Sequence, residues 1–340
     1  MQIFEIDGTS VPFSFHPTTL KSSKKARPRA QLTDNHIAML QLPIVDESSS
    51  DITKITFPNG IVNYVLLARQ NSSCPSLQRL HNYIMTAKNG DKLDTILTLL
   101  KNSRFLTDDL GGGKYVVSGY GNLGRNTKRR PPTQPCMRKS LTLPEHDAIA
   151  NVVGGILSCV ACCVQKHCEE LYIKNQKLKQ INPNLQWPSL KHQCLEYSWM
   201  SSQFVLRRWG PGLSKCQGGT PQKNMIVSAH VDRGDLDTVM PSIYCTGGGV
   251  DGKGGRVSGT DLALFENETG GAGVHIKTCI RDTVVVVMSN SRRQLHGCIL
   301  EESNAKHHDD LSAWSTRIIS YIPNGIYHWM LQNQKSMPAI

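Results

Sequence analysis

The stretch Ser228-Ala-His-Val-Asp-Arg-Gly-Asp-Leu-Asp-Thr-Val-Met-Pro-Ser242 follows a short apolar run and determines how the rest of the chain is interpreted. Alternate side chains of an extended strand point to the same face, so we expect His230 and Asp232 to converge on one point. An imidazole and a carboxylate arranged in this way are typical ligands of a divalent transition metal. Because the tripeptide H-x-D arises easily by chance, a metal site needs a further ligand elsewhere in the chain.

A second histidine supplies that ligand. His296 follows the run Val284–Met288, which is predicted to be a strand. Two histidines and one carboxylate leave three positions open on an octahedral metal, as in non-haem iron(II) oxygenases, whereas structural zinc sites are closed and tetrahedral. We therefore expect His230, Asp232 and His296 to bind Fe(II) and to be the catalytic residues.

Arg317 lies in the predicted strand Trp314–Ile322, after the last expected metal ligand. A guanidinium group offers a rigid fork that pairs with a carboxylate in a bidentate manner. We expect Arg317 to bind the distal carboxylate of a co-substrate such as 2-oxoglutarate. The alternative is an arginine on the outer face of an edge strand.

The order of these motifs resembles the double-stranded β-helix core of Fe(II)/2-oxoglutarate-dependent dioxygenases. In that order, H-x-D is followed by the runs Gly259–Phe265 and Asp282–Met288, then by His296-Gly297 and by Arg317. More narrowly, the residues from His230 to Ser242 resemble the Tet/J-binding-protein branch, in which H-x-D is followed by a further Asp and a Pro-Ser turn.

The resemblance covers roughly residues 200 to 323 and implies an activity. Enzymes of this branch oxidise the methyl group of a modified pyrimidine, here 5-methylcytosine to 5-hydroxymethylcytosine in DNA, with Fe(II), 2-oxoglutarate and O₂. The target base must be flipped out of the duplex to reach a buried metal. Asp235 would then accept a hydrogen bond from the cytosine amino group, although pairing with Arg233 explains this residue equally well. Some relatives use ascorbate instead of 2-oxoglutarate, and the iron ligands do not distinguish the two.

The charge of the chain also favours DNA as the partner. Lys and Arg total 38 against 27 acidic residues, a net charge of +11, which attracts polyanions. Arg125, Lys128, Arg129 and Arg130 follow a glycine-rich stretch that can approach phosphates closely, and we expect them to contact the substrate. An ordinary glycine-rich loop is the alternative. The G-x-G-x-x-G match at 119–124 opens no predicted helix, so it does not indicate a dinucleotide site.

The predicted fold class is α+β, with a double-stranded β-helix (jelly-roll, cupin-like) core and a helical, basic N-terminal half. The expected division is an N-terminal extension over 1–72, a helical and basic region packed on the core over 73–197, and the dioxygenase core over 198–325. Apolar spacing predicts two short helices between 75 and 102. Thr142 is expected to cap a long helix that continues to about Leu178.

Several features bear on location. The apolar segment Ala148–Val164 is interrupted by polar residues and glycines and is shorter than a membrane span, so we expect a core helix and no membrane partner. Its cysteines are expected to be small core residues, not zinc ligands. Eleven cysteines without a repeating spacing do not indicate a disulfide framework. The tract Lys21–Arg29 resembles a nuclear-localisation signal, which predicts a nuclear protein, although a solvated loop explains it equally well.

Two further interpretations stay open. One is a hydroxylase of the same superfamily that acts on a protein or a small molecule. The other is a catalytically inactive nucleic-acid-binding protein. The residues after Asp232 and the basic charge argue against the first, and the presence of all three metal ligands and Arg317 argues against the second. No protein partner is predicted.

Overall fold

A computed structural model describes residues 1–5, 16–18, 29–31, 43–85, 112–118, 142–180, 201–208, 225–245, 261–266, 273–278, 280, 282–299, 314–322 and 324–332. The described strands are β1 (Gln2–Glu5), β2 (His16–Thr18), β3 (Arg29–Gln31), β4 (Ile44–Val45), β5 (Ile52–Thr56), β6 (Val62–Ala68), β7 (Gly112–Ser118), β8 (Ser201–Arg208), β9 (Met225–His230), β10 (Met240–Cys245), β11 (Asp261–Phe265), β12 (Gly273–Ile276), β13 (Val284–Ser289), β14 (Leu295–Ile299) and β15 (Trp314–Tyr321). The described helices are α2 (Pro75–Met85), α4 (Leu143–His167), α5 (Glu169–Gln180) and α7 (Asn324–Gln332).

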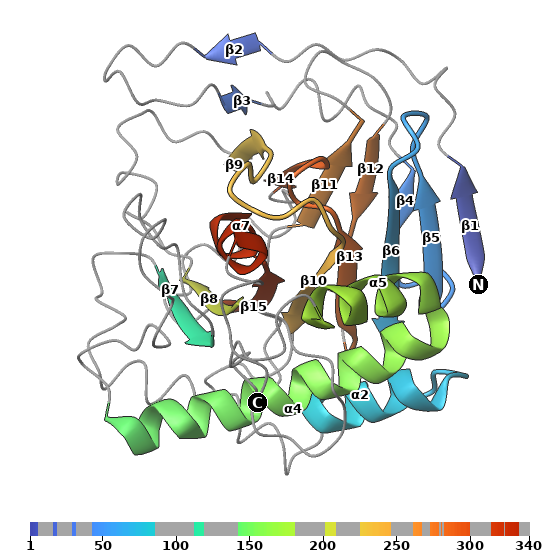
Figure 1. Cartoon of the computed structure of the whole chain (residues 1–340). Coiled ribbons are helices and arrows are strands. Elements are labelled where there is room, and N and C mark those ends of the chain that lie inside the picture. Colours follow the sequence, from blue (N-terminus) through green and yellow to red (C-terminus); the bar gives the residue numbers. More distant parts are fainter. Residues whose placement is uncertain are drawn as a thin grey trace.

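The strands form a large and a small sheet. The order is β1-β5-β6-β13-β10-β15-β8-β7 in the large sheet and β2-β3-β9-β14-β11-β12-β4 in the small sheet. Most neighbours are antiparallel, and the exceptions among the described pairs are β1 with β5 and β12 with β4. Two mostly antiparallel sheets with a layer of helices (Figure 1) are compatible with the predicted α+β class. Strands from the segment 1–72 take part in both sheets.

The strands from β8 to β15 pair in a nested order. The outermost strands, β8 and β15, pair in the large sheet, and β9 with β14 pair in the small sheet. The next pair, β10 with β13, is again in the large sheet, and β11 with β12 is in the small sheet. The chain therefore folds back on itself as one long hairpin whose successive pairs alternate between the two sheets.

The unbroken apolar run of β13 is explained by burial on both faces. Val284, Val286 and Met288 pack in the core that contains α2 and α4, whereas Val285 and Val287 pack against residues of the small sheet. Successive side chains of a strand point to opposite faces, so a strand between two cores has no polar face. The large sheet is therefore the middle layer, with helices on one face and the small sheet on the other.

The predicted N-terminus of α4 is confirmed. Thr142 is the N-cap, its hydroxyl accepts from the backbone N–H of Glu145, and the Glu145 carboxylate in turn accepts from the backbone N–H of Thr142. This capping box satisfies N–H groups that have no partner inside the helix.

The prediction of one continuous helix to Leu178 is wrong. The helix stops at Cys168, whose backbone leaves the helical region (φ −136°, ψ 50°), and α5 begins at Glu169. Glu169 and Glu170 occupy the first turn of α5, where negative charge is favoured by the helix dipole, so the local sequence starts a new helix there.

The helix α4 packs beside α2 along one side of the molecule (Figure 1). Its segment Asp147–His167 is long and apolar enough, by length and composition alone, to cross a membrane. In the structure, 65% of its most apolar part is buried, and residues such as Ile149, Val153 and Val160 belong to the core between the helices and the large sheet. Cys159, Cys163 and Cys168 are buried there, as expected of core cysteines.

Close contact between α2 and α4 depends on the absence of a side chain at Gly155. A Cβ atom at this position would overlap the Tyr83 hydroxyl oxygen. We therefore expect Gly155→Leu to lower the free energy of unfolding by about 1–3 kcal/mol, because the side chain overpacks a filled core. Gly325→Ala is the control, since a Cβ there meets nothing within 4 Å. Urea unfolding of both variants tests this, and equal stabilities would contradict it.

Candidate functional site

The two expected histidine ligands are partners on neighbouring strands of the small sheet. His296 of β14 lies opposite His230, the last residue of β9, in antiparallel register. On its other side His296 lies opposite Leu264 of β11, which belongs to the core between the sheets. Directly opposite residues on antiparallel strands have Cβ atoms about 5 Å apart and share a face. The His230 side chain itself lies outside the described residues, so its placement here is that of its backbone.

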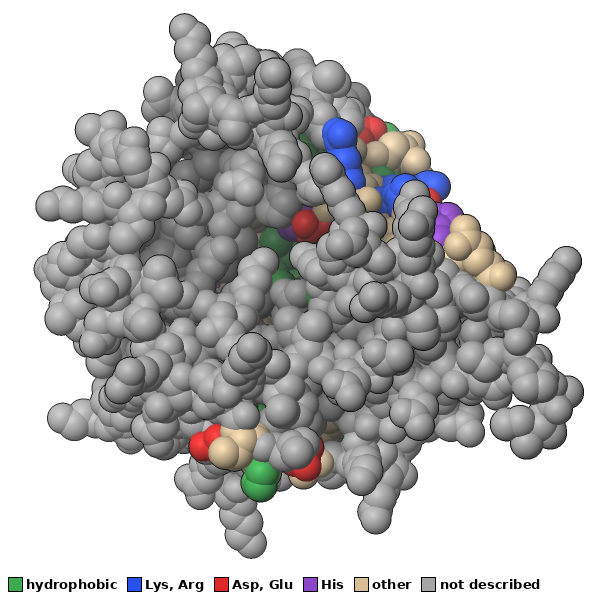
Figure 2. Space-filling model, turned by 60° about the vertical axis from the view of Figure 1, so that its left-hand side comes forward, with side chains coloured by type: hydrophobic (Ala, Val, Ile, Leu, Met, Phe, Trp, Pro, Cys, Tyr) green, Lys and Arg blue, Asp and Glu red, His purple; other side chains and the backbone are tan. Residues whose placement is uncertain are grey.

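Asp232 follows β9 by two residues and lies next to His296. The Asp232 carboxylate Oδ2 is 3.7 Å from the His296 Nε2 atom. The Asp232 backbone N–H donates to the Ser291 carbonyl at 2.8 Å, which joins the loop after β9 to the turn before β14. Figure 2 shows an acidic side chain next to a histidine side chain on one face of the molecule.

The orientation of the His296 ring leaves Nε2 suited to bind a metal. Its Nδ1 atom is 2.9 Å from the Gln294 carbonyl oxygen. A carbonyl oxygen only accepts, so Nδ1 carries the proton and the lone pair of the neutral ring is on Nε2, the atom that faces Asp232. Metal-binding histidines are commonly oriented by such a hydrogen bond from their second nitrogen. The chemistry of this donor set therefore fits a divalent metal.

In the part of the chain that the structure describes, no group of three His, Cys, Asp or Glu side chains is close enough to hold a metal. Asp232 and His296 supply two donors, and the register places the backbone of His230 where the third is expected. The residues present thus fit the predicted set, with His230 represented by its strand position.

A short turn before β14 holds the loop that carries Asp232. The Ser291 hydroxyl donates to the Asp235 carboxylate at 2.7 Å, and the Arg292 guanidinium donates to the Asp235 backbone carbonyl at 3.1 Å. The Asn290 amide donates to the Asp237 carboxylate at 2.7 Å. The predicted base-contacting residue Asp235 therefore lies beside the candidate metal site with one carboxylate oxygen engaged by Ser291.

Arg317 lies on the face of the large sheet that is turned toward the small sheet. In β15 it is opposite Tyr244 of β10, and Tyr244 belongs to the core between the sheets. The Arg317 guanidinium donates to the Tyr244 hydroxyl at 3.5 Å and lies 5.6 Å from the centre of its ring. The next residue, Ile318, belongs to the core on the helix side. The arrangement thus favours an inward arginine over one on an outer face.

Arg125, Lys128, Arg129 and Arg130 lie outside the described residues, and so does the predicted helix between 90 and 102.

Sequence reasoning did not assign a role to Tyr244, Asn290, Ser291 or Arg292. Asn290 hydrogen-bonds to Asp237 and Ser291 to Asp235, and each partner lies more than 50 positions earlier in the chain. The signal available in the sequence was the polar cluster directly before Leu295-His296, which is typical of a turn.

No protein-family model matches this chain, and a comparison with curated proteins found no match.

The pairing of Asp237 predicts a dependence of stability on pH. Partial burial raises the pKa of Asp237, but hydrogen bonds from Asn290 and Arg293 outweigh burial, and the pKa lies below its usual 3.8. A carboxyl with a lowered pKa in the folded state stabilises the fold above about pH 4, and this contribution is lost as the pH falls through the folded pKa. We expect Asp237→Asn to unfold at lower urea than the wild type at neutral pH, with the difference closing near pH 2.

The control is Glu47→Gln, an exposed position in a turn. The urea concentration at which half of the protein unfolds is compared for Asp237→Asn and the wild type. If the difference is as large near pH 2 as at neutral pH, the carboxylate charge is not what holds the two loops together.

Proposed function

We propose that this protein is an iron(II)-dependent oxygenase that oxidises the methyl group of 5-methylcytosine in DNA, with 2-oxoglutarate as co-substrate. The observation that carries the proposal is the meeting of Asp232 with His296, which lies opposite His230 in the β9–β14 register. Arg317, on the inner face of the facing sheet, supports the co-substrate part of it.

The nested pairing of β8 to β15 supports a finer assignment of the fold. Alternation of successive strand pairs between two sheets is what the proposed double-stranded β-helix, a jelly-roll arrangement, requires. In such a fold the second and seventh strands pair with each other. Here these are β9 and β14, which carry His230 and His296.

In this proposal His230, Asp232 and His296 hold Fe(II), which together with the co-substrate and O₂ supplies the oxidising chemistry for hydroxylation of a methyl group. The chain's own contribution is to orient these ligands. The Gln294 carbonyl keeps the His296 proton on Nδ1, and the Ser291 carbonyl fixes the backbone of Asp232. Both contacts come from one turn, so the carboxylate and the imidazole are positioned together.

Arg317 is suited to bind the carboxylate of 2-oxoglutarate that does not reach the metal. Its contact with Tyr244 is to a neutral hydroxyl and a ring face. A carboxylate bound by Arg317 would also meet the Tyr244 hydroxyl, which can donate to it. Ascorbate is the alternative co-substrate, and it is a lactone with no carboxylate group for Arg317 to bind.

The substrate part of the proposal rests on charge and on the loop after Asp232. The net charge of +11 favours a polyanion. Asp235 is held beside the candidate metal site by Ser291, and Arg292 hydrogen-bonds to its backbone. A carboxylate there can accept from the amino group of a flipped cytosine, and an arginine beside it can meet a phosphate. Arg125, Lys128, Arg129 and Arg130 are the further proposed DNA contacts.

We expect Asp232→Ala to reduce turnover by roughly 100-fold or more, because a carboxylate ligand is removed. The wild type and the variant are incubated with methylated duplex DNA and Fe(II), with 2-oxoglutarate and with ascorbate in separate reactions, and nucleosides are quantified by mass spectrometry. The control is Asp46→Ala, which follows β4 at the far edge of the small sheet.

If the wild type forms no modified nucleoside with either co-substrate, the proposal of a DNA oxygenase is wrong. If product forms with ascorbate but not with 2-oxoglutarate, ascorbate is the co-substrate. If Asp232→Ala turns over as fast as the wild type, Asp232 is not a metal ligand. Iron content of the purified wild type separates an inactive binding protein from an enzyme that acts on another substrate.

Arg317→Gln should raise the KM for 2-oxoglutarate by roughly 10- to 100-fold, since a hydrogen bond to a charged group contributes about 1.5–3 kcal/mol. Arg317→Lys keeps the charge but loses the forked guanidinium group, so its KM should lie between those of the wild type and of Arg317→Gln. Steady-state kinetics with varied 2-oxoglutarate tests this. If the KM is unchanged in Arg317→Gln while kcat falls, the arginine does not bind the co-substrate.

A further inference from the structure

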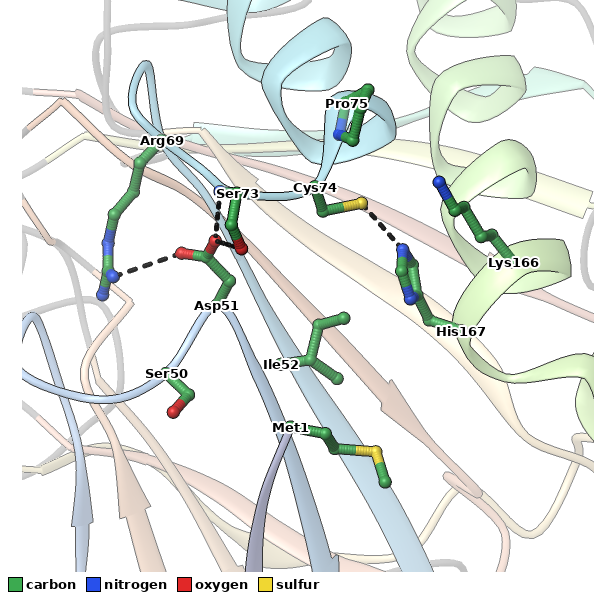
Figure 3. A pocket seen from close by; sticks show the side chains of 10 residues that line it. All are labelled: Met1, Ser50, Asp51, Ile52, Arg69, Ser73, Cys74, Pro75, Lys166 and His167. Atoms are coloured by element: carbon green, nitrogen blue, oxygen red, sulfur yellow. Dashed lines mark hydrogen bonds and ion pairs between the residues drawn. The ribbon is translucent and has the colours of Figure 1, made fainter.

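A pocket of about 550 Å³ lies where the first turn of α2 meets the end of α4, and it shares no residue with the candidate metal site. Its lining includes Asp51, Arg69, Cys74, Lys166 and His167 (Figure 3). The Asp51 carboxylate is already engaged, because it pairs with Arg69 at 3.4 Å and accepts from the Ser73 backbone N–H at 3.0 Å. Among the other lining groups, the Cys74 thiol and the His167 ring are in contact with each other.

Cys74 and His167 form a nucleophile–base pair. The Cys74 Sγ atom is 2.7 Å from the His167 Nε2 atom (Figure 3), although 93 residues separate them in the chain. The Ser76 hydroxyl oxygen is 2.8 Å from the same sulfur. A thiol within hydrogen-bond reach of an imidazole is the arrangement by which proteins activate cysteine as a nucleophile. A hydroxyl donor on the sulfur adds a second contact that stabilises a thiolate.

Both helix ends favour transfer of the thiol proton to the ring. Cys74 directly precedes α2, where the free backbone N–H groups favour negative charge, and His167 is the last residue of α4, where carbonyl groups favour positive charge. The exposed Lys166 adds a further positive charge next to the pair. The two helix ends stabilise the thiolate and imidazolium together relative to the neutral pair, whereas Lys166 favours the thiolate and disfavours the imidazolium.

Burial, with a contribution from Lys166, lowers the pKa of His167. The resting ring is therefore neutral at physiological pH and able to accept a proton. Burial raises the pKa of the Cys163 thiol and of the Cys168 thiol to about 12. A cysteine with such a pKa remains a thiol and reacts slowly. Cys74 is also buried, but it lines the pocket and contacts His167, whereas Cys163 and Cys168 are not among the residues that line the pocket.

We propose that Cys74 is a site of oxidation by small hydroperoxides, with His167 as its base. The Cys74 S–H proton passes to His167 Nε2, and the sulfur attacks the terminal oxygen of the hydroperoxide. The S–O bond forms as the O–O bond breaks, and the leaving oxygen takes the proton from His167. The products are Cys74 sulfenic acid and one molecule of alcohol or water, so the thiol is oxidised by two electrons and the peroxide reduced.

The full-length protein is treated with hydrogen peroxide and a sulfenic-acid-trapping reagent, and labelled peptides are quantified by mass spectrometry against time. Cys163 and Cys168 serve as internal controls in the same sample. We expect Cys74 to be labelled faster than both by roughly tenfold or more, and His167→Gln to remove most of that difference. Lys166→Gln, with the base retained, should keep most of it.

Equal labelling of Cys74, Cys163 and Cys168 in the folded wild type would overturn the proposal. So would a His167→Gln variant in which Cys74 reacts at the wild-type rate while the two internal controls remain unlabelled. If Cys163 and Cys168 become labelled in His167→Gln, the fold of that variant has opened. The labelling of Cys74 relative to Cys163 and Cys168 in the wild type then decides.

Discussion

The antiparallel pairing of β14 with β9 is the interaction on which the candidate metal site depends. It brings His296 opposite a residue 66 positions earlier, and the hydrogen bond from the Asp232 N–H to the Ser291 carbonyl extends the pairing beyond the strand ends. A shift of this register by one residue would turn every side chain of β14 to the other face. Buried Leu295 and Gln294 oppose such a shift, because Gln294 hydrogen-bonds to the Phe265 carbonyl at 2.6 Å and to Asn63 of the large sheet at 2.8 Å.

The large sheet separates two regions of different chemistry. Its inner face, with Tyr244 and Arg317, is turned toward the small sheet and the candidate metal site. Its other face is covered by α2 and α4, whose ends bring Cys74 next to His167. Both faces of β13, which lies in this sheet, are filled with apolar side chains.

Local signals in the sequence predicted local structure well. The Thr142 cap and the apolar run of β13 involve residues close together in the chain, and both were predicted and found. The helix break at Cys168 was missed, since the apolar periodicity continues across it and only the two glutamates that follow mark a new start. Tyr244 was also missed, because an aromatic residue in a strand indicates core packing and not which strand lies beside it.

By itself the sequence determined the types of donor available and the two-residue spacing of His230 and Asp232, since both depend on residue identity alone. Only the tertiary structure decided that Asp232 lies 3.7 Å from His296 and that Arg317 lies opposite Tyr244. The same holds for the Cys74–His167 pair, which no spacing rule predicts. The physical reason is that contacts across sheets and between helix ends depend on register and packing, which are properties of the whole folded chain.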